Sequence, residues 1–162
     1  ELESHLMLIY TGTDRLASRI ASKIVSNLQN QGPALERMHS MVDEGADILR
    51  GDGIIEEFGE LLHEGWLLKR QLAEGITNQA IDKVYETARN NGAIGGKITG
   101  AGGAGFILLF VPPSKQAKVR NSLDTYINVP ICIEDRGSTI IYSDGAVWGE
   151  SSTNQEAHSH GL

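Results

Sequence analysis

The sequence predicts an α+β protein, in which an antiparallel sheet of about four strands carries helices packed on one side. Three observations support this fold class. A strand-like apolar run opens the chain, four amphipathic helical patterns follow it, and short strand-like runs return in the last third. Between the helical and the strand-rich parts, seven of the 19 glycines fall within positions 92–105. That segment is therefore the first place to look for a function.

The first strand and the helices follow from hydrophobic periodicity. Residues 6–10 form an apolar run that ends in a Thr-Gly-Thr-Asp turn. Apolar residues then recur at spacings of three and four, which is the repeat of one helix face. This repeat predicts helices over about 15–29, 34–50, 54–73 and 77–91, the last with Thr77 as its N-cap and Gly92 as its terminator.

The last third contains strand patterns separated by turn residues. A continuous apolar run is typical of a central strand, and alternation of apolar with other residues is typical of a half-buried one. These patterns predict strands over 106–111, 129–134 and 138–142 and a short helix over 113–123. We expect residues 1–142 to form one domain and the polar residues 143–162 to be a disordered tail.

The composition limits the kinds of partner. With 162 residues, 40% of them hydrophobic and 22% charged, the chain can build an ordinary globular core. Its net charge of −7 argues against binding to nucleic acid or to an anionic membrane. Cys132 is the single cysteine and cannot form an internal disulfide, so we expect a cytoplasmic protein. No apolar run reaches the length of a membrane span, and no signal peptide opens the sequence.

Two common glycine motifs do not account for the segment 92–105. Gly96 and Lys97 supply the Gly-Lys pair of a P-loop, but Ile98 stands where that motif needs a hydroxyl residue. The glycines of a dinucleotide-binding motif are present within residues 100–105. They follow a predicted helix and precede a predicted strand, however, which is the reverse of the order that the motif requires. Both interpretations fail.

The segment Gly95-Gly-Lys-Ile-Thr-Gly-Ala-Gly-Gly-Ala-Gly105, followed by an apolar strand, resembles the third conserved motif of the GHMP kinases (galactose, homoserine, mevalonate and phosphomevalonate kinases). Other segments are similar to the sugar-kinase branch, and to its D-glycero-D-manno-heptose 7-phosphate kinases most of all: Tyr10-Thr-Gly with Arg15, Leu61-Leu-His-Glu-Gly-Trp66 with Lys69, and Ile76-Thr-Asn. The resemblance extends over roughly residues 1–142 but covers only the C-terminal half of a family member.

The resemblance implies a ferredoxin-like domain and ATP-dependent phosphorylation of a sugar hydroxyl, with Mg²⁺ bridging the nucleotide phosphates. The nucleotide loop and the catalytic acid of the family belong to an N-terminal domain that this chain lacks, so we expect no catalytic residue here and no activity from the chain alone. The residues implied to lie near phosphate are Gly95, Gly96, Lys97, Thr99, Gly100, Ala101, Gly102 and Gly103. Those implied to bind the sugar phosphate are Arg15, Lys97, and the pair Trp66 and Lys69 on a shoulder of the third helix.

A second interpretation is a non-catalytic module. Such a domain would bind a phosphosugar, form a homo-oligomer, or complement a separate N-terminal half, because halving a two-domain protein leaves an apolar patch. A metal site is not expected in this chain. His63 and Glu64 begin the zinc pattern H-E-x-x-H, but Leu67 stands at the second histidine position.

Overall fold

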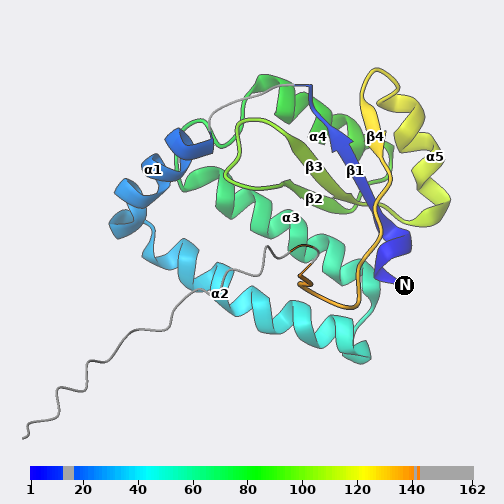
Figure 1. Ribbon diagram of the computed structural model, residues 1–162, viewed down its shortest axis with the longest axis horizontal. Helices are drawn as coiled ribbons and strands as arrows, with labels where there is room; N and C mark the ends of the chain where they lie inside the picture. Colours follow the sequence, from blue (N-terminus) through cyan, green and yellow to red (C-terminus); the bar gives the residue numbers. More distant parts are fainter. Residues whose placement is uncertain (13–16, 141, 143–162) are drawn as a thin grey trace, which may run out of the picture.

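The computed structural model describes residues 1–12, 17–140 and 142. Within these ranges the chain forms a four-stranded antiparallel sheet and five α-helices (Figure 1), which confirms the predicted fold class. The strands are β1 (Leu6–Tyr10), β2 (Gly95–Ile98), β3 (Phe106–Phe110) and β4 (Ile127–Val129). The helices are α1 (Ala17–Asn27), α2 (Gly32–Asp47), α3 (Ile55–Gln71), α4 (Gln79–Asn91) and α5 (Pro113–Ser122). No helix of the described part is long and apolar enough to cross a membrane.

The sheet has the strand order β2-β3-β1-β4, with every neighbouring pair antiparallel. Leu8 of β1 lies opposite Leu108 of β3 on one side and Val129 of β4 on the other. Leu108 in turn lies opposite Lys97 of β2. Because directly paired residues project from the same face of a sheet, these four side chains form a row across one face.

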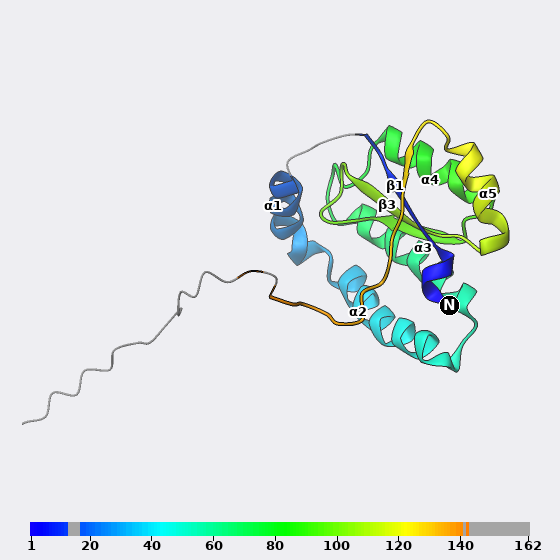
Figure 2. The ribbon, with the colours of Figure 1, turned by 45° about the vertical axis from the view of Figure 1, so that its right-hand side comes forward.

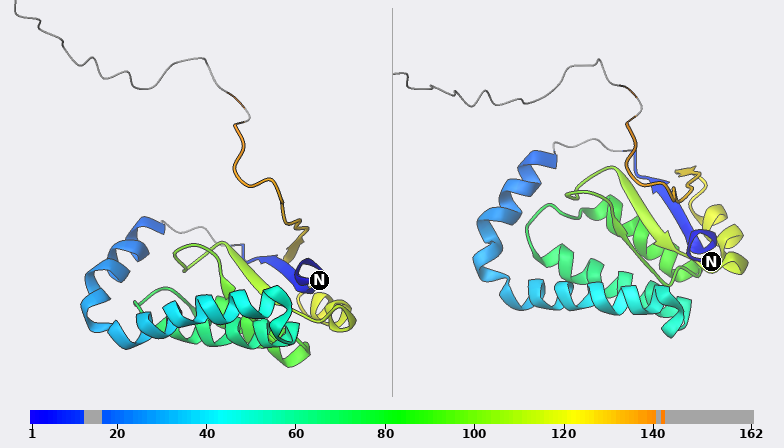
Figure 3. Two further views of the ribbon diagram at one scale, coloured as in Figure 1. Left: turned by 90° about the horizontal axis from the view of Figure 1, so that it is seen from below. Right: turned by 60° about the horizontal axis from the view of Figure 1, so that its bottom comes forward.

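Helices cover the other face. Alternate residues of the two central strands, among them Met7, Ile9, Ile107 and Leu109, are at most 3% exposed and belong to one hydrophobic cluster. The same cluster contains residues from α3, α4 and α5, namely Trp66, Ile81, Val84, Tyr85, Ala88 and Val119. Figure 3 shows these helices in a layer on one side of the sheet, with no described helix on the other.

Helices α1 and α2 form an outer arm. Helix α2 packs along α3, and Figures 2 and 3 show α1 continuing from it towards the end of the sheet where β2 turns into β3. Arg37 of α2 donates from Nε and Nη2 to the carboxylate of Glu64 of α3, at 2.6 and 2.7 Å, and also bonds to Glu44 on its own helix. This bidentate pair fixes the two helices side by side.

Two predictions for the strands are wrong, and one strand was not predicted. Residues 131–140 and 142 form no strand; the turn is present, with Gly137 at φ +67°, but its two arms are not paired. Only Ile127–Val129 joins the sheet at this end. Pro130 follows it directly, and proline has no N–H to donate to a neighbouring strand. Strand β2 was not expected, because its Gly-Gly-Lys-Ile sequence lacks the apolar alternation of a typical strand.

The start of α4 also differs from the expectation. Asn78, not Thr77, is its N-cap: the side-chain oxygen of Asn78 accepts from the backbone N–H groups of Ala80 at 3.0 Å and Ile81 at 3.1 Å. The hydroxyl of Thr77 donates instead to Asp82, at 2.7 Å. Gly92 ends the helix at φ +122°, as the sequence predicted.

Candidate functional site

The glycine loop, defined as residues 99–105, joins β2 to β3. At its base the N–H and the hydroxyl of Thr99 donate to the carbonyl oxygen of Phe106, at 2.8 and 3.2 Å. At the other end of the loop, the carbonyl oxygen of Gly105 accepts from the hydroxyl and the N–H of Thr11, which follows β1, at 2.8 and 2.9 Å. These bonds close the loop as the tip of a hairpin and attach it to the end of β1. Gly95, Gly96 and Lys97, which the resemblance assigned to the phosphate-proximal segment, lie in β2 rather than in the loop.

Lys69 of α3 fixes the start of the loop. Its ammonium group donates to the carbonyl oxygens of Ile98 and Gly100, at 3.2 and 2.5 Å. Burial, with a further contribution from the charge of Lys97, lowers the pKa of Lys69 to about 8. Lys69 therefore connects α3 to the end of β2 and to the start of the loop.

The middle of the loop is tied to the segment before α4. The N–H of Gly103 donates to the carbonyl oxygen of Ile76 at 2.7 Å, and the side-chain amide of Asn78 donates to the carbonyl oxygen of Gly103 at 3.1 Å. Asn78 thus caps a helix with its oxygen and holds the loop with its nitrogen. Asn78 was not among the residues expected at the site, although asparagine is a preferred N-cap residue, which was the available signal.

The glycines have different physical roles. A Cβ atom at Gly95 would lie 1.8 Å from the carbonyl oxygen of Gly59, so this glycine allows β2 to approach α3 closely. Gly100 has φ +66° and open space around it, so its role is conformational. Close packing is not confined to β2, because a Cβ atom at Gly102 in the loop would lie 2.7 Å from the carbonyl oxygen of Ile76.

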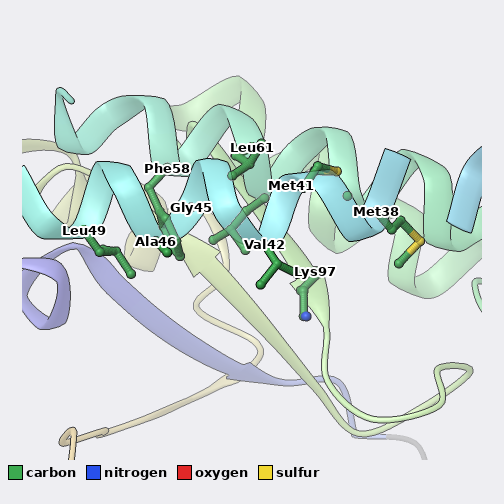
Figure 4. A pocket seen from close by; sticks show the side chains of 11 residues that line it. Met38, Met41, Val42, Gly45, Ala46, Leu49, Phe58, Leu61 and Lys97 are labelled. Atoms are coloured by element: carbon green, nitrogen blue, oxygen red, sulfur yellow. The ribbon is translucent and has the colours of Figure 1, made fainter. Parts of the chain in front are cut away.

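The loop presents groups that can receive an anion. Within the described ranges, the backbone N–H groups of Gly100, Ala101 and Gly102 have no acceptor. Lys97, which lies in β2 two residues before Thr99, is exposed and also has no described partner. Figure 4 shows its amino group beside α2, at the edge of a groove between α2 and α3. Successive free N–H groups beside a cation are typical of phosphate-binding loops.

Trp66 lies in the core and not on a shoulder of α3 as expected. It is 1% exposed and packs near Tyr85, and the guanidinium of Arg70 lies 5.7 Å from the centre of its ring. Among the described residues its Nε1 has no hydrogen-bond partner. Arg15 lies outside the described residues, so its proposed contact with substrate stays a prediction.

His63, which is half-buried, forms a polar pair with the buried Tyr85. Its Nδ1 lies 2.7 Å from the hydroxyl of Tyr85, and the two rings are stacked. Burial, followed by the charge of Arg89, lowers the pKa of His63, and burial raises the pKa of Tyr85 to about 12. Both groups are therefore neutral at physiological pH, and they connect α3 to α4.

The fold and the loop together define an α+β domain that presents a preorganised glycine loop, preceded in β2 by the exposed Lys97. The family described as GHMP kinases C terminal matches residues 47–128 of the chain. This protein belongs to the GHMP kinase family and represents its C-terminal domain, as the glycine segment indicated.

Several characterised proteins are similar to the chain. It is 30% identical over 126 residues to the D-glycero-alpha-D-manno-heptose 7-phosphate kinase of Campylobacter jejuni. The matched region covers 76% of this chain and 37% of that protein. It is 30% identical over 122 residues to the bifunctional fucokinase/GDP-fucose pyrophosphorylase of Arabidopsis thaliana, covering 73% of this chain and 11% of that protein. It is 28% identical over 138 residues to the mevalonate kinase of Pyrococcus horikoshii, covering 80% and 40% respectively.

Solved structures support the fold. The Methanococcus jannaschii mevalonate kinase superposes with a TM-score of 0.64 at 20% identity, over 76% of this chain and 38% of that one. The L. major mevalonate kinase in complex with R-mevalonate gives a TM-score of 0.62 at 19% identity, over 74% and 37%. In these kinases, as in the sequence relatives, the chain corresponds to well under half of the whole protein.

Proposed function

We propose that this chain forms the C-terminal part of an ATP-dependent small-molecule kinase, in which the glycine loop contacts a phosphate group of the nucleotide or of the substrate. The observation that carries the proposal is the loop itself. It is fixed by Lys69, Asn78 and Thr11, yet the N–H groups of three consecutive loop residues have no acceptor within the described ranges. The loop itself carries no charged side chain, and the lysine nearest to it in sequence is Lys97 of β2, in a chain of net charge −7.

The loop would contribute to phosphoryl transfer by positioning and by charge. Such reactions depend mainly on holding the phosphates in place and stabilising their negative charge. The N–H groups of Gly100, Ala101 and Gly102 would bind phosphate oxygens, and Lys97 would add a positive charge. Lys69 would keep the loop in the binding conformation, since its donors are occupied by loop carbonyls.

We propose a sugar phosphate as the acceptor, with a heptose 7-phosphate as the first compound to examine. Two relatives that are 30% identical have sugar kinase names, which supports this choice. Mevalonate kinases at 25–28% identity supply the competing candidate. Because Trp66 is buried and Lys97 is exposed, we assign contact with the substrate to Lys97.

Mg²⁺, when bound in such enzymes, bridges and neutralises the nucleotide phosphates. It keeps several waters and needs only one or two carboxylates. The described residues contain no group of three or more His, Cys, Asp or Glu side chains that could hold a metal. We therefore assign no residue of this chain to the metal.

A titration of the ¹⁵N-labelled chain with tripolyphosphate tests the phosphate contact. We expect saturable shifts of the amide signals of Gly100, Ala101 and Gly102. Lys97→Gln should weaken binding about fivefold, as expected for loss of one exposed charge contact. Lys118→Gln, which removes an exposed lysine from α5, should have no effect. Shifts confined to other regions, or equal effects of the two variants, would overturn the proposal.

The isolated chain should not transfer phosphate from ATP to a heptose 7-phosphate, because it spans only 37% of the heptose kinase it resembles. Turnover above that of a Lys97→Ala variant, measured by ³¹P NMR, would show that this expectation is wrong.

An assembly role is the second candidate, and the uncovered face of the sheet favours it. Leu8 and Leu108 occupy the centre of this face, and Phe106 and Ile127 on the same face are 37% and 63% exposed. An apolar sheet face of this kind is typical of an interaction surface. We propose that it binds a second domain or a second copy of the chain. A monomeric mass of 17.5 kDa at high concentration in sedimentation equilibrium would rule out the second copy.

A further inference from the structure

The groove between α2 and α3 is a second feature that could bind a ligand, and it is distinct from the glycine loop. It has a volume of about 390 Å³, within the range of small-molecule sites. Met38 and Met41 line it from α2, Leu49 from the helical turn that follows α2 (Ile48–Asp52), and Phe58 and Leu61 from α3. Lys97 reaches its edge from β2 and has the only polar side chain among the lining residues (Figure 4).

The charge at the groove is positive and uncompensated. The two carboxylates at the seam between α2 and α3, those of Glu44 and Glu64, are both bonded to Arg37. Lys97 has no partner within the described part of the chain, and the nearby ammonium of Lys69 adds a second positive charge. A purely apolar occupant would remove water from Lys97 without pairing its charge, which is costly.

We propose that this groove binds a small amphiphile with an apolar body and one anionic head group, of the type of a medium-chain carboxylate. The apolar body would lie between the two helices and displace water from the methionine, leucine and phenylalanine side chains. The head group would pair with the ammonium of Lys97 at the open edge. The proposal does not depend on the kinase function, because it rests on the groove and its charge alone.

The three methionines of the chain allow a direct test. Met38 and Met41 line the groove, whereas Met7 is 3% exposed in the core, in β1, and is not among the lining residues. With ¹³C-methyl-labelled methionine, decanoate should shift the signals of Met38 and Met41 saturably and leave that of Met7 unchanged. Each methylene removed from the ligand should weaken binding by up to about fourfold, so hexanoate should bind much more weakly.

The head group is tested with decanol and decyltrimethylammonium, which share the chain but not the negative charge. Decanol should bind about fivefold more weakly than decanoate, and the cation more weakly still. Lys97→Gln should reduce the affinity for decanoate to that for decanol and leave decanol binding unchanged. Lys118→Gln, on α5, is the matched control and should change neither.

The position of the ligand is tested by filling the groove. Ala46→Trp places a large side chain among the lining residues and should abolish binding, whereas Ala117→Trp on an exposed position of α5 should not. The proposal is overturned if Met7 shifts together with Met38 and Met41, if neither groove methionine shifts, or if all three head groups bind equally. It is also overturned if the chain dimerises and this dimerisation broadens the Met38 and Met41 signals, because a second copy then covers the groove.

Discussion

Lys69 shows how one side chain links the helices to the loop. Its ammonium holds two loop carbonyls, and its lowered pKa follows from burial first and from the charge of Lys97 second. Lys97→Gln should therefore raise the pKa of Lys69 above 8 without restoring it to 10.5, because burial remains. A pH titration of the ¹³Cε signal of Lys69 measures this. An unchanged pKa would mean that the two ammonium groups do not interact.

The lowered pKa of Lys69 also predicts how the free energy of unfolding depends on pH. The folded-state pKa of about 8 lies below the unfolded value of 10.5, so the unfolded chain binds more protons between these pH values. The contribution of Lys69 to the free energy of unfolding is least favourable below pH 8 and improves as pH rises to 10.5. Relative to Lys69→Met, the wild-type chain should therefore gain stability across this window in urea unfolding. A parallel pH dependence of the two proteins would contradict this account.

Gly95 and Gly100 are required for different physical reasons, close packing at Gly95 and backbone conformation at Gly100. Gly95→Ala places a Cβ 1.8 Å from the carbonyl oxygen of Gly59 and should destabilise the fold by about 3 kcal/mol. Gly100→Ala meets no atom within 4 Å but is held at φ +66°, and should cost about 1 kcal/mol. Urea unfolding curves compare the two. Equal costs would mean that the approach of β2 to α3 relaxes easily.

At the scale of elements, the helices could be predicted and part of the sheet could not. Helices α2 and α3 each have an apolar stripe that is local in sequence, so periodicity identifies them within a few residues. A strand depends on a partner that sequence does not reveal. Residues 138–140 have strand-forming side chains without a partner strand, whereas β2 has two glycines and is paired with β3 along its whole length.

The site could be predicted in part for the same reason. The glycine segment and Lys97 were identified because their sequence is distinctive. The bonds from Lys69 and Asn78 to the loop join residues 31 and 25 positions apart, and no local pattern indicates them. The burial of Trp66 likewise depends on Tyr85 of α4, which the repeat of α3 alone does not include.

The junction between α4 and the loop depends on Asn78. Asn78→Ala should cost about 1 kcal/mol and increase hydrogen exchange at the amides of Ala80 and Ile81, which lose their acceptor. Asn78→Asp keeps the cap oxygen but loses the donor to Gly103, so it should loosen the loop and not the helix. Exchange at Ala80 and Ile81 that increases more in Thr77→Ala than in Asn78→Ala would show that the cap is assigned to the wrong residue.

At the scale of the whole molecule, the domain is asymmetric. One face of its sheet is covered by α3, α4 and α5, and the other presents apolar side chains and ends beside the glycine loop (Figures 1 and 3). The chain spans 37–40% of the heptose and mevalonate kinases it resembles. The uncovered face and the glycine loop beside it are both consistent with a domain that works against a second surface.

The central claim is that the glycine loop contacts the phosphates of a nucleotide. Paramagnetic relaxation by Mn²⁺·ATP tests it most directly, because the metal accompanies the phosphates and the effect falls steeply with distance. We predict the strongest relaxation at the amides of Gly100, Ala101 and Gly102, beyond that caused by Mn²⁺ alone. Relaxation that is strongest elsewhere, or that is equal with and without ATP, would contradict the account.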